Sequence, residues 1–417
     1  MSRYAEIKTK YLFNIYNGAT PGSGVPEYWG GDIVWVTPSD MSKVDGDYLY
    51  DSERRITLEG LNSCGTNVFP EESIVISTRA PIGAVCMAGV PMCTNQGCKT
   101  LVSKTQENAK FYYYFMKVNT KQLNSLGRGT TFLELSNSDL SNVKVPYPSL
   151  QIQTEIVTYL DRKTARINEI ISDKQKLIAL HREKRQSIIS EAVTRGLDKK
   201  APMKESGVEW IGEIPQEWEM KPLFIVAFEN QVKNTGNVNT NVLSLSYGKI
   251  VRRDVGTNFG LLPESFEGYQ VVDEGYIILR LTDLQNDKNS LRSGYVTEKG
   301  IITSAYVGLV CREIVYSRFM EYLLHTYDLM KIFYGLGNGV RQSMNYKDLK
   351  WLPIPITSIE EQIAIADYLD LKTSRIDSTI KDIKVQINKL KEYRQCIISE
   401  VVTGKVMVEN LSQGGLS

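Results

Sequence analysis

Residues 159–167 read YLDRKTARI, and residues 368–376, which lie 209 positions further along, read YLDLKTSRI. The likeness continues to Thr194 and Thr403, so that 19 of the 36 positions compared are identical. An offset of half the 417-residue chain indicates that the sequence contains two copies of one unit. Two equal copies in one chain predict pseudo-two-fold symmetry, as in a dimer of separate chains.

Each copy predicts one long helix. Neither copy contains Gly or Pro before Gly196 and Gly404, and each follows a stretch with two prolines, at 146–148 and at 353–355. Proline shortly before an apolar periodic segment is typical of a helix start. At 1.5 Å per residue, a helix of about 40 residues would span about 60 Å.

Apolar residues recur along both helices at alternating steps of three and four, the spacing of a coiled-coil seam. The seam residues are Leu160, Ile167, Ile171, Ile178 and Ile188 in the first copy and Leu369, Ile376, Ile380, Ile383, Ile387, Leu390 and Ile397 in the second. Thr164 and Arg185 interrupt the seam at positions matched by Thr373 and Arg394. We therefore expect the two helices to form an antiparallel coiled coil. Two separate amphipathic helices, each lying on its own domain, are the alternative.

The segments that precede the helices, 1–147 and 206–350, share a layout but little residue identity. Both have short apolar runs between turn signals, as at 33–36, 73–77 and 275–280, which predict strands. Both continue with an aromatic-rich helical patch, at 111–117 and at 319–333, and close with Leu-Gly-x-Gly. The expected fold class is α+β, with two similar mixed domains joined by two long helices. The expected boundaries are 1–147 for the first domain, 148–196 for the central helix, 197–212 for an extended connector, 213–356 for the second domain, 357–404 for the last helix and 405–417 for a tail.

The composition is that of an ordinary globular protein, with 42% hydrophobic and 23% charged residues. No apolar run is long enough for a transmembrane helix, and the first residues lack the apolar region of a secretory signal. The six cysteines show no Cys-x-x-Cys and no other framework spacing. We therefore expect reduced thiols and a cytoplasmic protein.

The sequence lacks the residues of common catalytic sites. Its two histidines, His181 and His325, have no neighbours arranged for nucleophilic catalysis or for zinc. There is no Pro-Pro, and hence no Asn/Asp-Pro-Pro-aromatic loop of a DNA methyltransferase. Neither Gly248-Lys249 nor Gly404-Lys405 is followed by the hydroxyl residue of a P-loop. We expect a chain that is not an enzyme and that holds no metal.

Six stretches stand out as longer motifs. They are 26–40 (PEYWGGDIVWVTPSD), 77–83 (STRAPIG), 94–97 (TNQG), 205–215 (ESGVEWIGEIP), 266–269 (FEGY) and 281–288 (LTDLQNDK). Together they resemble the specificity subunits of type I restriction-modification systems, over nearly the whole chain.

The resemblance implies a non-catalytic subunit of a restriction endonuclease and adenine-specific DNA methyltransferase complex. Each domain would be a target recognition domain that reads one half of a bipartite, asymmetric site in double-stranded DNA. The paired helices would set the spacer and dock two methyltransferase (M) subunits, and restriction/translocase (R) subunits would join them. S-adenosylmethionine, ATP and Mg would be used by these partners, with no cofactor in the chain itself. Two diverged domains on a stiff spacer independently predict two different half-sites at a fixed gap.

The candidate DNA-contacting residues lie in these motifs and in the Gly-rich turns. Arg reads guanine, Asn and Gln read adenine, and Lys, Ser and Thr contact the backbone. The candidates in the first domain are Thr37, Ser39, Ser77, Thr78, Arg79, Asn95, Gln96, Lys99, Arg128 and Thr130. Those in the second domain are Arg280, Thr282, Asp283, Gln285, Asn286, Arg292, Asn338, Arg341 and Gln342.

Other roles for these residues stay open at this point. Residues 77–79 could cap a turn, and residues 95–97 could satisfy backbone groups of a loop. We expect Trp35 and Trp210 in the core and His181 packed at the helix seam. The second function class that the sequence allows is a coiled-coil scaffold whose domains bind protein.

Neither domain is basic. Residues 1–147 hold 14 basic and 14 acidic residues, and residues 206–350 hold 15 and 17, so the net charges are 0 and −2. Because neutralised phosphates dominate DNA affinity, we expect tight DNA binding to require the methyltransferase subunits.

Overall fold

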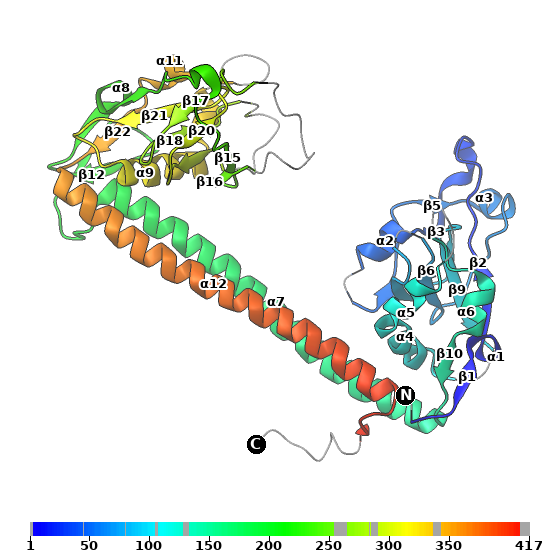
Figure 1. Cartoon of the computed structure of the whole chain (residues 1–417). Helices are drawn as coiled ribbons and strands as arrows, with labels where there is room; N and C mark the ends of the chain where they lie inside the picture. Colours follow the sequence, from blue (N-terminus) through cyan, green and yellow to red (C-terminus); the bar gives the residue numbers. More distant parts are fainter. Residues whose placement is uncertain are drawn as a thin grey trace. The chain divides into compact units, whose positions relative to one another are not determined.

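The computed structural model describes residues 3–44, 46–79, 81–104, 107–127, 133–253, 265–282, 284, 291–336 and 343–408. The chain divides into two compact units, one of Met1–Lys174 with Lys384–Ser417 and one of Gln175–Ile383. The long helices are α7, Leu150–Arg195, and α12, Ile359–Val402. Each unit therefore holds one globular head and part of both long helices (Figure 1). Head 1 denotes residues 3–149, and head 2 denotes residues 196–358.

Head 1 contains ten strands and six α-helices within its described residues. The strands are β1 Glu6–Lys8, β2 Phe13–Asn17, β3 Trp29–Val36, β4 Tyr48–Leu49, β5 Arg55–Ile56, β6 Ile74–Ser77, β7 Val85–Ala88, β8 Met92–Thr94, β9 Cys98–Ser103 and β10 Lys144–Pro146. The helices are α1 Thr9–Leu12, α2 Pro38–Ser42, α3 Leu58–Asn62, α4 Ala109–Val118, α5 Thr120–Ser125 and α6 Asn137–Asn142, with a 3-10 turn η1 at Pro26–Tyr28.

Head 2 has the same mixture of elements. Its strands are β11 Met203–Glu205, β12 Glu213–Pro215, β13 Glu219–Pro222, β14 Ala227–Glu229, β15 Leu243–Ser246, β16 Lys249–Arg252, β17 Gln270–Val272, β18 Ile277–Leu279, β19 Ser293–Tyr295, β20 Gly300–Ile302, β21 Val307–Cys311 and β22 Pro353–Ile356. Its helices are α8 Leu223–Val226, α9 Ser317–Leu329, α10 Ile332–Leu336 and α11 Tyr346–Leu349, with a 3-10 turn η2 at Thr235–Asn237.

The two heads share one antiparallel strand order. The order is β2-β9-β6-β7 in head 1, extended at the edge by β4, and β14-β21-β18-β19 in head 2. Each head also has a strand that pairs with the strand preceding the long helix, as β1 with β10 and β13 with β22. The expectation of two similar mixed domains is confirmed, because matched strands follow one another in the same order along each half of the chain.

The heads differ in the rest of their strands. Head 1 adds a three-stranded sheet, β5-β3-β8, whereas head 2 adds the pairs β15-β16 and β17-β20. The shared sheet thus forms a common frame, and the added strands account for much of the divergence between the two halves.

The aromatic patches form the helices that follow the shared sheet. In α4 the residues from Phe111 to Met116 are all buried. The second patch, expected to be helical over 319–333, is divided into α9 and α10. Lys331 lies between them with φ of +61°, a left-handed conformation that a regular helix cannot contain.

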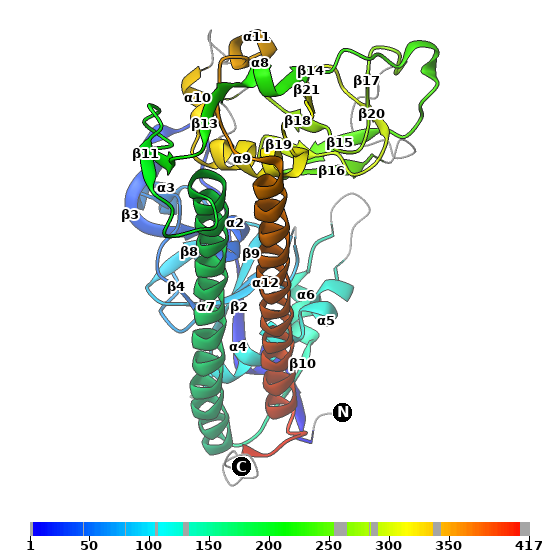
Figure 2. The ribbon, with the colours of Figure 1, turned by 90° about the vertical axis from the view of Figure 1, so that its left-hand side faces the viewer.

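The long helices run antiparallel in the unit of head 1. Arg394 donates a hydrogen bond to Asn168, and Lys174 Nζ lies 2.6 Å from Gln386 Oε1, so position numbers rise on one helix as they fall on the other. Both views show α7 and α12 side by side (Figure 1, Figure 2). In the unit of head 2, Arg185 Nε lies 3.3 Å from Asp377 Oδ1. The two arginines that interrupt the expected seam therefore each reach across to the other helix.

The seam follows the predicted spacing. Ten of its twelve residues are buried, and Ile188 and Leu390 are half-buried. Ile189, the neighbour of Ile188, is fully buried because this part of α7 also packs on head 2. The coiled-coil pairing is confirmed within each unit, and the alternative of two separately lying helices is wrong.

Each head packs on both long helices. The core of head 1 includes Leu160 of α7 together with Ile397 and Val401 of α12. The core of head 2 includes Leu369 of α12 together with Val193 of α7. Each core is therefore completed by a helix from the other half of the sequence.

The connector contains more structure than expected. Its strand β11 pairs with β12 in a hairpin, with Met203 opposite Pro215. Of the tail, residues 409–417 lie outside the described part of the chain. Within the described residues, no helix combines the length and the apolarity that a bilayer crossing requires.

Candidate nucleic-acid interface

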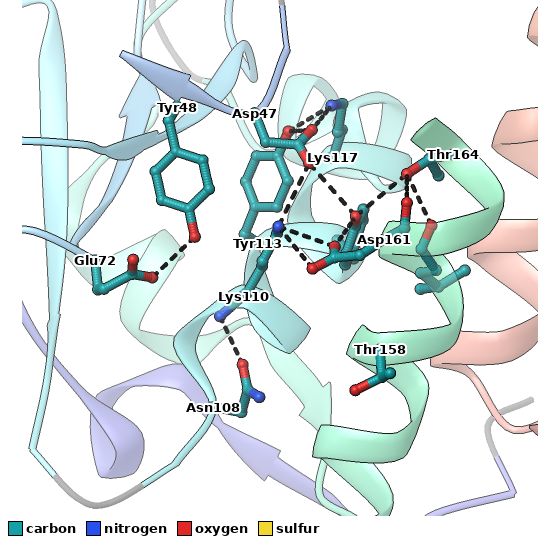
Figure 3. Close-up of polar contacts among 12 residues, drawn as sticks. Asp47, Tyr48, Glu72, Asn108, Lys110, Tyr113, Lys117, Thr158, Asp161 and Thr164 are labelled. Carbon is teal, nitrogen blue, oxygen red and sulfur yellow. Dashed lines mark hydrogen bonds and ion pairs between the residues drawn. The ribbon is translucent and has the colours of Figure 1, made fainter. Parts of the chain in front are cut away.

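A polar clamp joins head 1 to α7. Tyr114 of α4 donates a hydrogen bond of 2.6 Å to Asp161. Lys110 Nζ lies 2.9 Å from the same carboxylate, as Figure 3 shows. The Tyr114 and Thr164 hydroxyls lie 3.5 Å apart. Burial raises the pKa of Tyr114, so its hydroxyl keeps the proton that it donates. Two side chains of one head helix thus hold a single carboxylate of the long helix.

The same clamp recurs in head 2. Tyr322 of α9 donates a hydrogen bond of 2.6 Å to Asp370, Arg318 lies 2.6 Å from that carboxylate, and Thr373 lies 3.3 Å from the tyrosine hydroxyl. Burial alone would raise the pKa of Asp370, but the hydrogen bonds from Arg318 and Tyr322 outweigh it and hold this pKa below its usual range. Asp161 and Asp370, like Thr164 and Thr373, are matched positions of the internal repeat.

A buried glutamine supports each clamp. Gln153 accepts a hydrogen bond from the Asn108 backbone N–H and donates to the Pro148 carbonyl. Gln362, 209 positions later, accepts from the Tyr316 backbone N–H and donates to a carbonyl before its own helix. Sequence reasoning missed both glutamines because the repeat was compared from residue 159 onward. Extending the comparison upstream would have found this identical pair.

Head 1 has a further polar network at α4. Asp47 lies 2.8 Å from Lys117 Nζ and accepts a hydrogen bond of 2.6 Å from Tyr113 (Figure 3). Burial favours a raised pKa for Asp47, but the charge and hydrogen bond of Lys117 and the hydrogen bond of Tyr113 lower it below its ordinary value. These contacts fix the segment before β4 onto α4.

Several candidate residues meet in a cluster of loops in head 1, formed by residues 17–20, 36–39, 78–79 and 94–99. The Asn95 N–H donates to the Val36 carbonyl, and the Ala19 N–H donates to the Thr94 carbonyl. A Cβ on Gly18 would lie 2.0 Å from the Asn95 oxygen, so only glycine permits this close approach. The sequence motifs at 26–40, 77–83 and 94–97 therefore form one surface region, called the head 1 loop cluster below.

Four of the predicted residues in this cluster shape its backbone. Thr37 caps α2 in a capping box with Asp40. Ser77 and Thr78 are fully buried, and their hydroxyls donate to the carbonyls of residues 81 and 97. Asn95 accepts a hydrogen bond from the Gly97 N–H. The alternatives considered for residues 77–79 and 95–97, capping a turn and satisfying loop backbone groups, thus describe Ser77 and Asn95, whereas Thr78 bonds to a segment 19 residues away.

The other predicted residues of head 1 offer more polar surface. Ser39 and Gln96 are exposed, and Gln96 accepts a hydrogen bond from Thr20. Arg79 pairs with Glu134 at 2.7 Å. Lys99 is buried, donates to Asn17, and has a lowered pKa because burial disfavours its charge. Among the described candidates of head 1, Ser39, Arg79 and Gln96 are the exposed ones, which a large ligand could reach directly.

In head 2 the described candidates lie around one buried arginine. Arg292 is fully buried, and it donates hydrogen bonds to the carbonyls of Thr282, at 2.6 Å, and Arg280. Arg280 and Thr282 are half-buried. The remaining candidates, Arg128 and Thr130 of head 1 and Asp283, Gln285, Asn286, Asn338, Arg341 and Gln342 of head 2, lie outside the described residues.

The two tryptophans expected in the core and the histidine expected at the helix seam are buried or half-buried. Trp35 is buried, Trp210 is half-buried against the core of head 2, and His181 is half-buried on α7.

All six cysteines are free thiols. Within the described residues, no three His, Cys, Asp or Glu side chains are grouped so that they could hold a metal ion.

Known proteins share this sequence pattern. The model of a family described as "Type I restriction modification DNA specificity domain" matches residues 1–180. The type I restriction enzyme MjaIX specificity subunit of Methanocaldococcus jannaschii is 34% identical over 227 residues, which cover 52% of this chain and 50% of that protein. The EcoprrI specificity subunit of Escherichia coli is 33% identical over 172 residues, which cover 37% of this chain and 41% of that protein. The chain is similar to the type I restriction enzyme specificity subunits over these segments. It spans about half the length of these curated relatives.

Solved specificity-subunit structures share the fold. A chain from a study of complex assembly and conformational transition in a type I R-M system aligns with a TM-score of 0.71 at 15% identity, covering 97% of this chain and 98% of that one. The HsdS subunit of Thermoanaerobacter tengcongensis aligns with a TM-score of 0.52 at 16% identity, covering 97% of both chains. At such low identity, the likeness concerns the fold alone.

Proposed function

We propose that this chain is the DNA-specificity subunit of a type I restriction-modification complex. Each head reads one half of a bipartite, asymmetric site in double-stranded DNA, and the paired helices set the spacer between the half-sites. The chain itself performs no catalysis. Methyltransferase subunits use S-adenosylmethionine, and restriction subunits use ATP and Mg.

One observation carries this proposal. The same clamp of a tyrosine and a basic residue on an aspartate and a threonine, the latter two at matched positions of the repeat, holds two heads that differ in their added strands on the paired helices. A constant attachment for divergent heads suits a protein that presents two different readers in a fixed geometry. The relatedness to specificity subunits supplies the ligand class, DNA.

A pair of matching hollows supports docking of two like subunits. In the unit of head 1, Ser399 of α12 and Thr403, directly after that helix, line a hollow together with Gln122 of head 1. In the unit of head 2, Ser190 and Thr194 of α7 line a hollow with Met330, and these two α7 residues are the repeat counterparts of Ser399 and Thr403. Two copies of one methyltransferase subunit would meet similar surfaces at these hollows.

The test is the methylome of the host. Deleting the gene should remove adenine methylation at one bipartite motif, and restoring the gene should return it. Ser39→Ala and Gln96→Ala should change or weaken recognition of one half-site only, because both residues lie in head 1. Tyr11→Phe, at an exposed site outside the loop cluster, is the matched control. An unchanged methylome, with intact and active partner genes, would favour the protein-binding scaffold instead.

A further inference from the structure

An arginine that no sequence motif singled out lies flat on a tryptophan beside the head 1 loop cluster. The Arg54 guanidinium carbon is 3.5 Å from the centre of the Trp29 ring and 5.9 Å from that of Trp35. The two indoles pack edge to face at 5.1 Å. The Arg54 guanidinium thus lies against the Trp29 indole, and the residue as a whole is exposed to solvent.

The backbone under Arg54 is fixed. The Ser52 hydroxyl accepts a hydrogen bond from the Trp35 N–H and donates one of 2.7 Å to the Arg54 carbonyl. Immediately after Arg54 the chain enters β5, where both Trp29 and Ile33 of β3 lie opposite Ile56 across a bulge. The paired strands β3 and β5 therefore hold the Arg54–Trp29 stack in place.

The indoles tie the stack to the head 1 loop cluster. The Trp35 Nε1–H donates to the Ala19 carbonyl, and the Trp29 Nε1–H donates to the Gly22 carbonyl. The Ala19 backbone N–H in turn donates to the Thr94 carbonyl, and the Thr20 hydroxyl donates to the Gln96 side-chain oxygen. Arg54 thus stands at the rim of the surface that carries Ser39 and Gln96.

Among the described residues, cations near Arg54 are paired with carboxylates, whereas Arg54 is not. Arg55 lies 3.0 Å from Asp51, Lys43 lies 2.7 Å from Glu53, and Arg79 lies 2.7 Å from Glu134. Among the described residues, Arg54 has no carboxylate within ion-pair distance. A full positive charge that is held in place, exposed and without an anion is suited to an external anion.

We propose that Arg54, positioned by Trp29, contacts a backbone phosphate of the DNA that head 1 reads. This inference rests on the proposed function and adds a residue to it. A phosphate is favoured over a base edge because the side chain lies back on the indole at the rim. A base-reading arginine must extend into a groove, whereas the phosphate backbone passes over the rim of a reading surface.

The test uses the complex that the chain forms in its host. DNA binding is measured on one duplex that carries the bipartite motif found in the methylome and on one duplex in which that motif is scrambled. Arg54→Gln should raise Kd by about 3- to 10-fold on both duplexes and reduce the salt dependence, d log K/d log[salt], by about 1. Arg54→Lys should keep the salt dependence, because it keeps the charge. Trp29→Leu should weaken binding while the salt dependence stays, because the charge remains but is no longer positioned.

Arg55→Gln is the matched control, since Arg55 is adjacent, exposed and already paired, and it should leave Kd unchanged. Thermal unfolding of each variant verifies that the fold is intact. If Arg54→Gln binds both duplexes like the wild type, the inference is wrong while the proposed function stands. If Arg54→Gln loses only discrimination at one base position, Arg54 reads a base and the phosphate assignment is wrong. If the wild-type complex does not bind the duplex with the bipartite motif more tightly than the scrambled duplex, the proposed function fails.

Discussion

At the scale of single residues, the tyrosine hydroxyls of the two clamps offer a direct comparison. Tyr114→Phe and Tyr322→Phe each remove one hydrogen bond to a carboxylate, Asp161 or Asp370. Because these carboxylates are 40% and 46% exposed, we expect each substitution to cost only about 1 kcal/mol of the free energy of unfolding. Urea unfolding measures this cost, with Tyr11→Phe as the exposed control. Very unequal costs would contradict the view that the clamps are equivalent.

A second residue, His325, gives the unit of head 2 a pH dependence. Burial, with a smaller contribution from Arg185, lowers the pKa of His325 to about 4. Between that value and the ordinary one of about 6.5, the unfolded chain binds more protons than the folded chain. Stability should therefore fall by about 3 kcal/mol as the pH drops through this window.

His325→Gln should remove most of that pH dependence. Burial raises the pKa of Glu321 on the same helix, which acts in the opposite sense, but Glu321 is present in both proteins and cancels in the comparison. The measurement is the free energy of unfolding of wild type and variant from pH 4 to pH 7. Parallel curves over that range would show that His325 does not titrate as proposed.

Residue type alone predicted the site only in part. Ser77 and Thr78 have side chains that can contact DNA, yet the Ser77 hydroxyl closes a turn to residue 81 and the Thr78 hydroxyl bonds to the carbonyl of residue 97. The sequence could not single out Arg54, because only the pairing of β3 with β5 brings it onto Trp29. Exposure and stacking depend on contacts between distant segments, and a list of polar residues does not contain them.

At the scale of elements, the helix seam is the feature that sequence predicted best. A strict spacing of three and four depends only on helix geometry, so it fixed the buried face of both helices. The turn at Lys331 was missed because helix propensity gives no signal for a lysine with positive φ. The hairpin of β11 and β12 was also missed, since both strands are only three residues long.

The seam leads to a stability prediction. Ile380 is 8% exposed, so Ile380→Ala should destabilise the paired helices by about 2–4 kcal/mol through lost burial and a residual cavity. Leu371→Ala on the same helix, at a position 50% exposed, should change stability by much less. Thermal or urea unfolding followed by circular dichroism compares the two. Equal effects would mean that Ile380 does not pack at the seam.

At the scale of the whole molecule, charge limits what the chain can do alone. With net charges of 0 and −2 on the two head segments, we expect the isolated chain to bind its cognate duplex weakly at physiological salt. Adding the methyltransferase subunits should increase the affinity strongly. A gel-shift titration with and without them measures the difference, and nanomolar binding by the isolated chain would contradict the prediction.

The interleaving of the two sequence halves has a consequence for synthesis. Head 1 is translated first, but its core is closed by Ile397, Val401 and Val402 near the end of α12. The ribosome must therefore almost finish the chain before the first head can complete its packing, in contrast to the usual order in which N-terminal domains fold first. A prematurely terminated product would keep an open apolar face on head 1 and would be recognisable to chaperones and proteases as unfinished.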